Sequence, residues 1–423
     1  MRLKRAMDKS PTCRIVIIGA GFGGINAARS LARVRGVEII LIDRNNYCTF
    51  TPLLYQVAAA QLEPALIAYP IRNFLRRASC VRFVLADVQQ IDLAEQILEV
   101  DGLTLSYDFL ILATGARYQF GNISGAQDYA LPVGTLEEAI NLRNHILHCF
   151  EQAACESDFT RRLALLSFAI VGGGPTGIEV AGALVELIQS ALVPDYPRLD
   201  FQNVKVTLVQ SDERLLADFP KRLCDYTLKQ LRRMGVQVYL RSRVKQVTPD
   251  AIYLSDGTAI ATRTTIWTAG VEAAPPHANQ DLAAAAKGKL VVQSTLQLPD
   301  HPQVYVIGDL AFVETEGRSL AGVAPEALQQ GNAAAQNIKR QLRGLEPKPF
   351  RYFDKGRAAI IGSNTGVACL FNKLSVTGFP AWLLWLGIHL FYLPGIRNRL
   401  FVLMNWIYNY LFQRRATRLI LPK

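Results

Sequence analysis

The sequence from Arg14 to Gly24 reads RIVIIGAGFGG, a short apolar run that ends in a glycine-rich turn with the spacing GxGxxG. A strand before such a turn and a helix after it leave the N–H groups at the helix start free to bind a pyrophosphate. The next apolar run ends at Asp43, about 20 residues further on, where a carboxylate can accept from ribose hydroxyls. The stretch predicts a βαβ unit that binds a dinucleotide.

The same pattern recurs later in the chain, where the apolar run FAIV at 168–171 precedes GGGPTG at 172–177. A helical pattern over 178–189 and a strand pattern over 204–209 follow. Strand-like segments come after each turn, at 98–105, 109–112, 251–254 and 264–267, with a further one at 304–307. We therefore predict an α/β fold with two Rossmann-like dinucleotide-binding domains, the second inserted in the first.

Two polar residues of the second unit, Gln210 and Glu179, bear on the choice of nucleotide and on the chemistry. The strand over 204–209 ends before Gln210, so the ribose position carries a neutral amide there, and Arg214 lies close in sequence. An amide does not repel a 2′-phosphate, which predicts that NADPH is tolerated beside NADH. Glu179 falls in the first turn of the predicted helix. It is either a carboxylate favoured by the helix dipole or a polar group beside the hydride path.

The C-terminal part combines positive charge with apolar stripes. From Lys355 to the end there is no Asp or Glu, whereas nine Lys and Arg residues occur, against a net charge of +11 for the chain. The apolar run 381–393 would span about 20 Å as a helix, short of the ~30 Å hydrocarbon core. Apolar residues then recur at helical spacing from Ile396 to Leu411. We predict a peripheral anchor on an anionic membrane surface; a buried helical pair is the alternative, and nucleic acid is not expected.

Length and cysteine usage limit the remaining possibilities. A chain of 423 residues is long enough for two or three domains. Its seven cysteines form no CxxC motif, which argues against a zinc site and against a thioredoxin-like site. The basic first residues lack the apolar segment of a secretory signal. We expect no metal, and a location on the cytoplasmic side of a membrane.

Several further segments carry a family resemblance. They are DRNNY at 43–47, TPLLYQVA at 51–58, ATG at 113–115, GGGPTGIEVAGA at 172–183, TIWTAGV at 265–271, VIGDL at 306–310, and the AWL, HL and RNR segments at 381–399. Together they resemble the flavoproteins with two dinucleotide-binding domains that are related to glutathione reductase. More narrowly, they resemble type II NADH:quinone dehydrogenases, over about residues 12–420.

The resemblance implies roles for particular residues. FAD would be held by Gly19, Gly21, Phe22, Gly23, Gly24, Asp43, Arg44, Thr114, Gly115, Gly308, Asp309 and Ala324. The nicotinamide nucleotide would be held by Gly172, Gly174, Pro175, Thr176, Gly177, Gln210, Ala269 and Gly270. Glu179 and Gln329 would act in catalysis. Gln329 belongs to the segment 324–330, which aligns with the family's AQxAxQ quinone motif but has Pro325 in place of the first Gln.

The domain boundaries expected from the resemblance are 12–118 and 271–345 for the FAD domain, 119–270 for the NAD(P)H domain and 346–423 for the membrane-associating region. The expected activity is electron transfer from NADH, with NADPH as a further substrate, to a membrane quinone without proton pumping. A homodimer is compatible with this. The alternatives are a reductase of a ferredoxin-like carrier, sulfide:quinone-type chemistry, or a nucleotide-sensing or scaffold protein without turnover.

Overall fold

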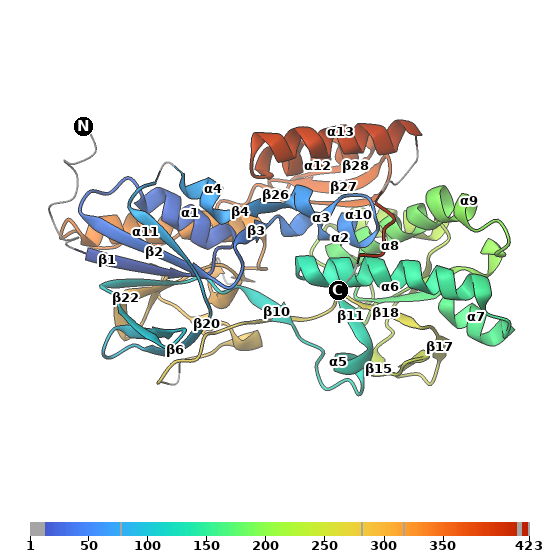
Figure 1. Cartoon of the computed structure of the whole chain (residues 1–423), viewed down its shortest axis with the longest axis horizontal. Coiled ribbons are helices and arrows are strands. Elements are labelled where there is room, and N and C mark those ends of the chain that lie inside the picture. Colours follow the sequence, from blue (N-terminus) through green and yellow to red (C-terminus); the bar gives the residue numbers. More distant parts are fainter. Residues whose placement is uncertain (1–12, 77, 281, 316–317, 413–416, 422–423) are drawn as a thin grey trace. The chain divides into compact units, whose positions relative to one another are not determined.

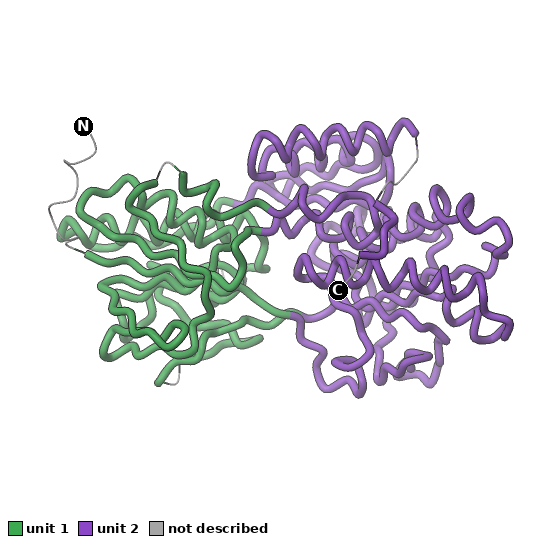
Figure 2. Tube along the Cα trace, in the orientation of Figure 1, with its two compact units in different colours: residues 1–48, 69–117, 271–353 green, residues 49–68, 118–270, 354–423 purple. Residues whose placement is uncertain are grey.

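The computed structural model describes residues 13–76, 78–280, 282–315, 318–412 and 417–421. These residues form two compact units, shown in different colours in Figure 2. Unit 1 contains residues 13–48, 69–117 and 271–353, and unit 2 contains residues 49–68, 118–270 and 354–421. Each unit is therefore assembled from three separate stretches of the chain.

A six-stranded sheet forms the centre of unit 1, in the order β21-β22-β9-β1-β2-β5 (Figure 1). All neighbouring strands are parallel except the edge pair β21 and β22. The register places Cys13 opposite Val37 and Ile18 opposite Ile42. The strands are β1 (Cys13–Ile18), β2 (Val37–Asp43), β5 (Val81–Leu85), β9 (Phe109–Leu112), β21 (Gln297–Leu298) and β22 (His301–Val306).

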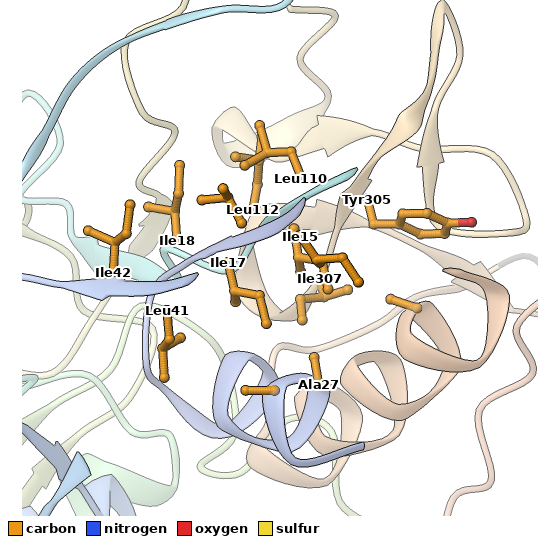
Figure 3. Packing of buried hydrophobic residues seen from close by; sticks show 14 of the residues in the cluster. Ile15, Ile17, Ile18, Ala27, Leu41, Ile42, Leu110, Leu112, Tyr305 and Ile307 are labelled. Carbon is orange, nitrogen blue, oxygen red and sulfur yellow. The ribbon is translucent and has the colours of Figure 1, made fainter. Parts of the chain in front are cut away.

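Two helices, α1 (Phe22–Leu31) and α11 (Ala324–Gln341), pack against each other in unit 1. Glycines permit the contact, because a Cβ at Gly331 would lie 2.3 Å from the carbonyl oxygen of Gly23. Buried side chains of the strands and of these helices form one core (Figure 3). Ile15 and Ile17 of β1 are fully buried, which explains why this strand is apolar without alternation.

Unit 2 contains a five-stranded parallel sheet in the order β11-β18-β12-β13-β14. Its strands are β11 (Ala130–Pro132), β12 (Ser167–Val171), β13 (Lys205–Val209), β14 (Gln237–Tyr239) and β18 (Thr264–Trp267). The helices of this unit include α6 (Leu136–Cys155), α8 (Pro175–Leu187) and α10 (Lys221–Arg233). A capping box between Thr135 and Glu138 fixes the start of α6.

Each unit also carries a small antiparallel sheet, β6-β7-β8 in unit 1 and β15-β16-β17 in unit 2. The segment 98–105, expected as one extended piece, is a hairpin whose turn at Asp101 and Gly102 has positive φ angles of 49° and 75°. The strands are β6 (Val88–Asp92), β7 (Ile97–Val100), β8 (Leu103–Ser106), β15 (Val244–Val247), β16 (Ala251–Leu254) and β17 (Ala259–Ala261). The repetition predicted from the sequence thus extends to these hairpins.

The C-terminal segment of unit 2 is an antiparallel sheet followed by two helices (Figure 1). These elements are β26 (Gly356–Gly362), β27 (Thr365–Leu370), β28 (Leu374–Gly378), α12 (Phe379–Tyr392) and α13 (Ile396–Phe412). Strand β26 packs on α8 so closely that a Cβ at Gly182 would lie 1.7 Å from the carbonyl oxygen of Ile361. Ala381 and Trp385 of α12 and Val402 of α13 are buried, so both helices are part of the packed unit.

Within the described residues, one helical stretch, Pro175–Asp195, is long and apolar enough to cross a membrane, and 67% of its most apolar window is buried. That stretch contains α8, the helix after the second glycine-rich turn. The shorter elements include α2 (Leu54–Ala58), α3 (Pro64–Ile67) and the 3₁₀ turn η5 (Gly308–Leu310).

Candidate functional site

The first glycine-rich turn has the geometry that a bound pyrophosphate requires. Gly19 has a φ of +100°, and a Cβ there would lie 2.3 Å from the carbonyl oxygen of Ala113. A Cβ at Gly24 would lie 1.9 Å from the carbonyl oxygen of Gly19. Gly21 differs, because its Cβ would meet nothing within 4 Å, and no side chain caps the helix that starts after it. The N–H groups at the start of α1 therefore face open space that suits an anion.

Asp43 connects the end of β2 to this turn. Its Oδ2 accepts the N–H of Ala20 at 2.7 Å, and its Oδ1 accepts the N–H of Asn45 at 2.7 Å. Burial raises the pKa of the carboxyl, while these two hydrogen bonds and the neighbouring Arg44 oppose the rise. The carboxylate is thus held at the expected ribose position by the backbone of the turn itself.

The other residues expected near FAD come from separate elements of unit 1. Asp309 lies in η5, and burial raises the pKa of its carboxyl although Lys289 opposes the rise. No described residue donates a hydrogen bond to it, so its oxygens can accept from a polyhydroxyl chain. Gly308 has a φ of +73°, and Gly115 has a φ of +75° with nothing within 4 Å of its Cβ position. The hydroxyl of Thr114 instead donates to the carbonyl of Ala274 at 2.6 Å.

Three more residues of the expected FAD set lie around the contact between α1 and α11. Phe22 and Gly23 begin α1, and a Cβ at Gly23 would lie 3.0 Å from the side chain of Ile307. Ala324 is the first residue of α11. The open space at Gly21 and Gly115, together with the buried carboxyl of Asp309, fits the pyrophosphate and ribityl parts of FAD.

The second glycine-rich turn repeats the first almost position by position. Gly172 has a φ of +114°, and a Cβ at Gly177 would lie 1.9 Å from the carbonyl oxygen of Gly172. A Cβ at Gly174 would meet nothing within 4 Å. Pro175 opens α8 and Thr176 follows it, in a first turn where a missing N–H costs little. The unit 2 turn therefore presents a second anion site.

Gln210 holds the second turn as Asp43 holds the first. Its Oε1 accepts the N–H of Gly173 at 2.7 Å, and its Nε2 donates to Oδ2 of Asp212 at 2.7 Å. A carboxylate therefore lies beside the expected ribose position although the strand ends in an amide. Arg214, expected to offer positive charge, forms an ion pair with Glu213 at 3.3 Å. The sequence pattern did not single out Asp212, because it lies two residues beyond the usual acid.

The segment Thr268-Ala269-Gly270 follows β18 and closes the other side of this turn. The hydroxyl of Thr268 donates to the carbonyl of Val171 at 2.9 Å. A Cβ at Gly172 would lie 2.9 Å from the N–H nitrogen of Ala269. Gly270 has a φ of +69°. These contacts place Ala269 and Gly270 at the glycine turn of unit 2, where the sequence expects them.

Glu179 lies beyond the first turn of α8, and not in it as the sequence predicts, because the helix begins at Pro175; only 8% of the residue is exposed. Its Oε1 accepts the N–H of Ile360 on β26 at 3.3 Å. Burial raises the pKa of this carboxyl to about 8, against the smaller lowering influence of hydrogen bonds from Ile360 and the Trp385 side chain. A buried carboxyl with such a pKa can hold and release a proton near neutral pH. A surface acid that merely complements the helix dipole would remain ionised and exposed.

Comparison with known proteins identifies the family. The pyridine nucleotide-disulphide oxidoreductase family profile matches residues 13–331. Over 421 residues the chain is 38% identical to the type II NADH:quinone oxidoreductase Ndh of Mycobacterium tuberculosis, covering 95% of this chain and 89% of that protein. The chain belongs to the type II NADH:quinone oxidoreductase family.

One further relative supports this assignment, and one solved structure shares the fold. The type II NADH:quinone oxidoreductase NdhA of the same organism is 36% identical, with 95% of this chain and 88% of that protein covered. The solved structure of NDH2 from Plasmodium falciparum in complex with NADH is 19% identical and superimposes with a TM-score of 0.87, covering 97% of this chain and 100% of that one. The α/β dinucleotide-binding fold expected from the sequence is thereby confirmed.

The segment that aligns with the quinone motif of type II oxidoreductases begins α11. Both ends of the Gln329 amide pair with the main chain of Phe353, each at 3.0 Å. The neighbouring Gln330 is buried and accepts the N–H of Gly308 at 2.6 Å. Pro325 lies in the first turn of α11, where its missing N–H costs little. Gln330 is thus a residue that the sequence did not single out, and it ties α11 to the Gly308 turn.

A cavity of about 790 Å³ lies within unit 2. Its two walls differ in chemistry. One wall comes from residues 55–61, from the helical stretch Pro175–Asp195 and from the β26–β27 turn, and includes Gln61, Glu186, Ser190, Ser363 and Asn364. The other wall comes from α12 and α13 and is mainly apolar, with Trp382, Leu383, Leu386, Gly387, Leu390, Leu403 and Ile407.

The seven cysteines are all free thiols, five of them buried. Burial raises the pKa of Cys48 to about 12, so this thiol is protonated and unreactive at neutral pH. Within the described residues, no group of three His, Cys, Asp or Glu side chains could hold a metal ion.

Proposed function

We propose that this protein is a non-proton-pumping, FAD-dependent oxidoreductase that transfers electrons from NADH to a membrane quinone. The observation that carries the proposal is the repeated turn: two glycine sites with the same backbone geometry, each beside a side chain that holds the turn. Bound FAD supplies the redox chemistry, accepting a hydride equivalent and passing on two electrons. The protein binds, orients and shields the reacting groups.

We propose that separate ranges of the chain form the FAD-binding, NAD(P)H-binding and membrane-associating parts. Residues 12–118 and 271–345 form the FAD-binding domain, residues 119–270 form the NAD(P)H-binding domain inserted in it, and residues 346–423 form a membrane-associating region. The N–H groups at the starts of α1 and α8 would bind the two pyrophosphates. Asp309 accepts from the ribityl hydroxyls, because no described residue donates a hydrogen bond to its carboxyl.

We propose that NADH is preferred to NADPH. The neutral amide of Gln210 alone would tolerate a 2′-phosphate, but its Nε2 bonds the carboxylate of Asp212 at 2.7 Å. A phosphate near that carboxylate would be repelled. The preference is moderate rather than strict, because Asp212 is exposed and its charge is screened by solvent.

Glu179 is proposed to supply a proton during quinone reduction. A quinone takes up two electrons and two protons, and a general acid is most effective when its pKa is near the working pH. The pKa of about 8 meets this condition. Gln329 is proposed as a residue of the quinone pocket, where the main-chain bonds to Phe353 fix the direction of its amide.

Membrane association is proposed to use the outer face of α12 and α13, on the cytoplasmic side of the membrane. Exposed apolar side chains gather on these helices: Phe391, Ile396, Leu400, Phe401, Met404, Tyr408, Leu411 and Phe412. Arg397 and Arg399 lie at the start of α13 and suit anionic head groups. A quinone substrate dissolved in the bilayer would then be within reach, and a homodimer is compatible with this arrangement.

One experiment tests the catalytic proposal. The purified protein should be yellow, NADH should bleach its flavin absorbance near 450 nm under anaerobic conditions, and a short-chain quinone should restore it. Ferredoxin should restore it at least about tenfold more slowly than the quinone. A colourless protein, or a reduced protein that quinone fails to reoxidise, would contradict the proposal.

A second experiment tests the membrane proposal. Deleting the tail would also remove Trp385 and Val402 from the core of unit 2, so substitutions are the cleaner choice. Leu400→Glu together with Met404→Glu should abolish sedimentation with vesicles containing phosphatidylglycerol while the flavin remains bound. Leu103→Glu places the same charge on an exposed apolar residue of a unit 1 hairpin and should leave sedimentation unchanged. Vesicle binding that survives the double substitution would overturn the assignment of this face.

A further inference from the structure

Helix α8 carries two carboxyl groups on one face. Glu179 and Glu186 are seven residues apart, which corresponds to nearly two full turns and a rise of about 10 Å. Both accept N–H groups from the segment that packs on this face, Glu179 from Ile360 of β26 and Glu186 from Ser363 in the turn after β26. Glu186 also accepts from Nε2 of Gln61 at 3.3 Å. The two acids therefore lie along one line, at the interface between α8 and β26.

The environments of the two acids differ. Glu179 is buried, whereas Glu186 is partly exposed beside the turn that contains Ser363 and Asn364, both of which are exposed. The 790 Å³ cavity runs along the same interface, because Glu186, Ala183 and Ile360 all line it. Ile360 is the residue whose N–H bonds Glu179. The cavity thus touches the partly exposed acid, Glu186, and the residue whose N–H bonds the buried acid.

The reaction requires a proton path to the interior. NADH supplies two electrons and one hydrogen as hydride, so reduction of a quinone to a quinol needs one additional proton from solvent for each turnover. If Glu179 gives that proton, it must be reprotonated before the next cycle. Its carboxyl is buried, and about 10 Å separates it from Glu186, which is too far for a direct hydrogen bond.

We propose that Glu186 takes up protons at the exposed end of this cavity and relays them through water to Glu179. The inference rests on the proposed function, in which Glu179 is the proton donor. The cavity is large enough for a chain of water molecules, each of which occupies about 30 Å³ in the liquid. The side chains of Gln61, Ser190, Ser363 and Asn364 offer the polar partners that such waters need. Glu186 is thus a proton-relay residue, and not one that touches the substrate.

Stopped-flow measurement of the two half-reactions tests the proposal. In Glu186→Gln, bleaching of the flavin by NADH should stay within about twofold of the wild-type rate, while reoxidation by a short-chain quinone should slow at least about tenfold. Formate at millimolar concentration should restore much of the reoxidation rate, because a small acid can enter the cavity. The reoxidation rate of Glu186→Asp, which keeps a carboxyl, should lie between the rates of Glu186→Gln and wild type. Glu151→Gln removes an exposed acid that accepts from Tyr196, and should match wild type.

A second variant tests the water path while both acids remain. Ala183 lines the cavity between the two carboxyls, so Ala183→Val should narrow it and slow reoxidation without slowing bleaching. Formate should not rescue this variant. The relay is overturned if reoxidation is unchanged in Glu186→Gln, if both half-reactions slow equally, or if formate has no effect. Failure of the wild-type protein itself to reoxidise with quinone would instead contradict the proposed function.

Discussion

The two glycine-rich turns share one backbone design and differ in the side chains around it. Gly24 and Gly177 each place a Cβ position 1.9 Å from a carbonyl oxygen, and Gly21 and Gly174 each face open space. The side chain that holds the turn is an acid in unit 1, Asp43, and an amide in unit 2, Gln210. We therefore expect pyrophosphate binding to depend on backbone shape, and the choice of nucleotide to depend on a few side chains.

A second difference lies at the fifth residue of each helix, two residues after the last glycine of the turn. Asn26 of α1 donates to the carbonyl of Leu328 at 2.7 Å and so ties α1 to α11. The corresponding residue of α8 is Glu179, a buried carboxyl with a pKa of about 8. The same place in the repeat ties two helices together in one unit and holds a buried, titratable carboxyl in the other. The predictions below test these differences, beginning with the largest effect.

The largest effects are expected from substitutions of Gly24 and Gly177, because each should impair one nucleotide site and leave the other intact. Gly24→Ala should abolish FAD binding, lowering flavin content by about 100-fold or more, because the new Cβ forces α1 away from β1. Gly177→Ala should leave the flavin bound and raise the KM for NADH by a similar factor. Flavin absorbance and steady-state kinetics measure both effects. Gly21→Ala is the control for folding: its Cβ meets no protein atom, so the protein should fold while FAD binding weakens.

Removing the Glu179 carboxyl from α8 should slow quinone reduction but not flavin reduction by NADH. Glu179→Gln should slow quinone reduction by about 100-fold, since a general acid contributes 10²–10⁴. Flavin reduction by NADH should change little. Asn26→Asp, which places an acid at the corresponding position of α1, should not rescue the loss. Equal slowing of both half-reactions would show that Glu179 has a structural role.

The pKa of Glu179 also sets a pH dependence. The protonated form is the donor, so quinone reduction should decline as the pH rises through about 8. Because the folded pKa lies above the ordinary value of 4.5, the associated stability is fully present below about 4.5 and is lost as the pH rises through 8. Rate–pH profiles and thermal melts should both lose this dependence in Glu179→Gln. A decline that persists in the variant would assign the titration to another group.

Changing the residue that holds the first turn should give an intermediate effect. Asp43→Asn loses a charged acceptor for the N–H of Ala20, an interaction of about 1.5–3 kcal/mol, so FAD affinity should fall about tenfold. Titration of apo-protein with FAD measures it. The reciprocal change Gln210→Asp should keep NADH binding and reduce NADPH binding, as expected if the two positions are equivalent. Unchanged FAD affinity in Asp43→Asn would show that the charge of Asp43 is not needed to hold the first turn.

The smallest expected effect concerns nucleotide preference. Asp212→Asn removes the carboxylate beside Gln210 while keeping a side chain that can accept from Nε2. The ratio of kcat/KM for NADPH to that for NADH should rise about fivefold, a modest change because the group is exposed and screened. Asp200→Asn, elsewhere on unit 2, is the matched control. No change in the ratio would show that Gln210 alone sets the preference.

Much of the fold could be predicted because its signals are local. The apolar runs before Gly19 and Gly172 became β1 and β12, and the helical patterns after them became α1 and α8. The segment 109–112 is β9 as expected. Helix α11 begins at Ala324, because Glu326 caps the helix start through the N–H groups of Gly322 and Val323. Such capping by a later side chain is hard to read from periodicity.

The sites were predictable only in part. Glycine positions and strand-end acids follow from the covalent pattern, so Gly19, Asp43 and Gln210 could be found directly. Asp212, Glu186 and Gln330 could not, because their importance depends on which groups lie beside them in space. The sequence also left Glu179 between two interpretations, and the structure adds that its carboxyl is buried against β26.

The sequence by itself determined that this chain has two nucleotide-binding turns, since a glycine turn between strand and helix specifies its own geometry over a few residues. Only the tertiary structure decided the environment of Glu179, the cavity beside Glu186 and the packing of α12 into unit 2. Those features require β26 and α12, about 180 and 200 residues beyond Glu179, to pack around the same helix. Burial and pKa depend on such distant contacts, which no local pattern in the sequence encodes.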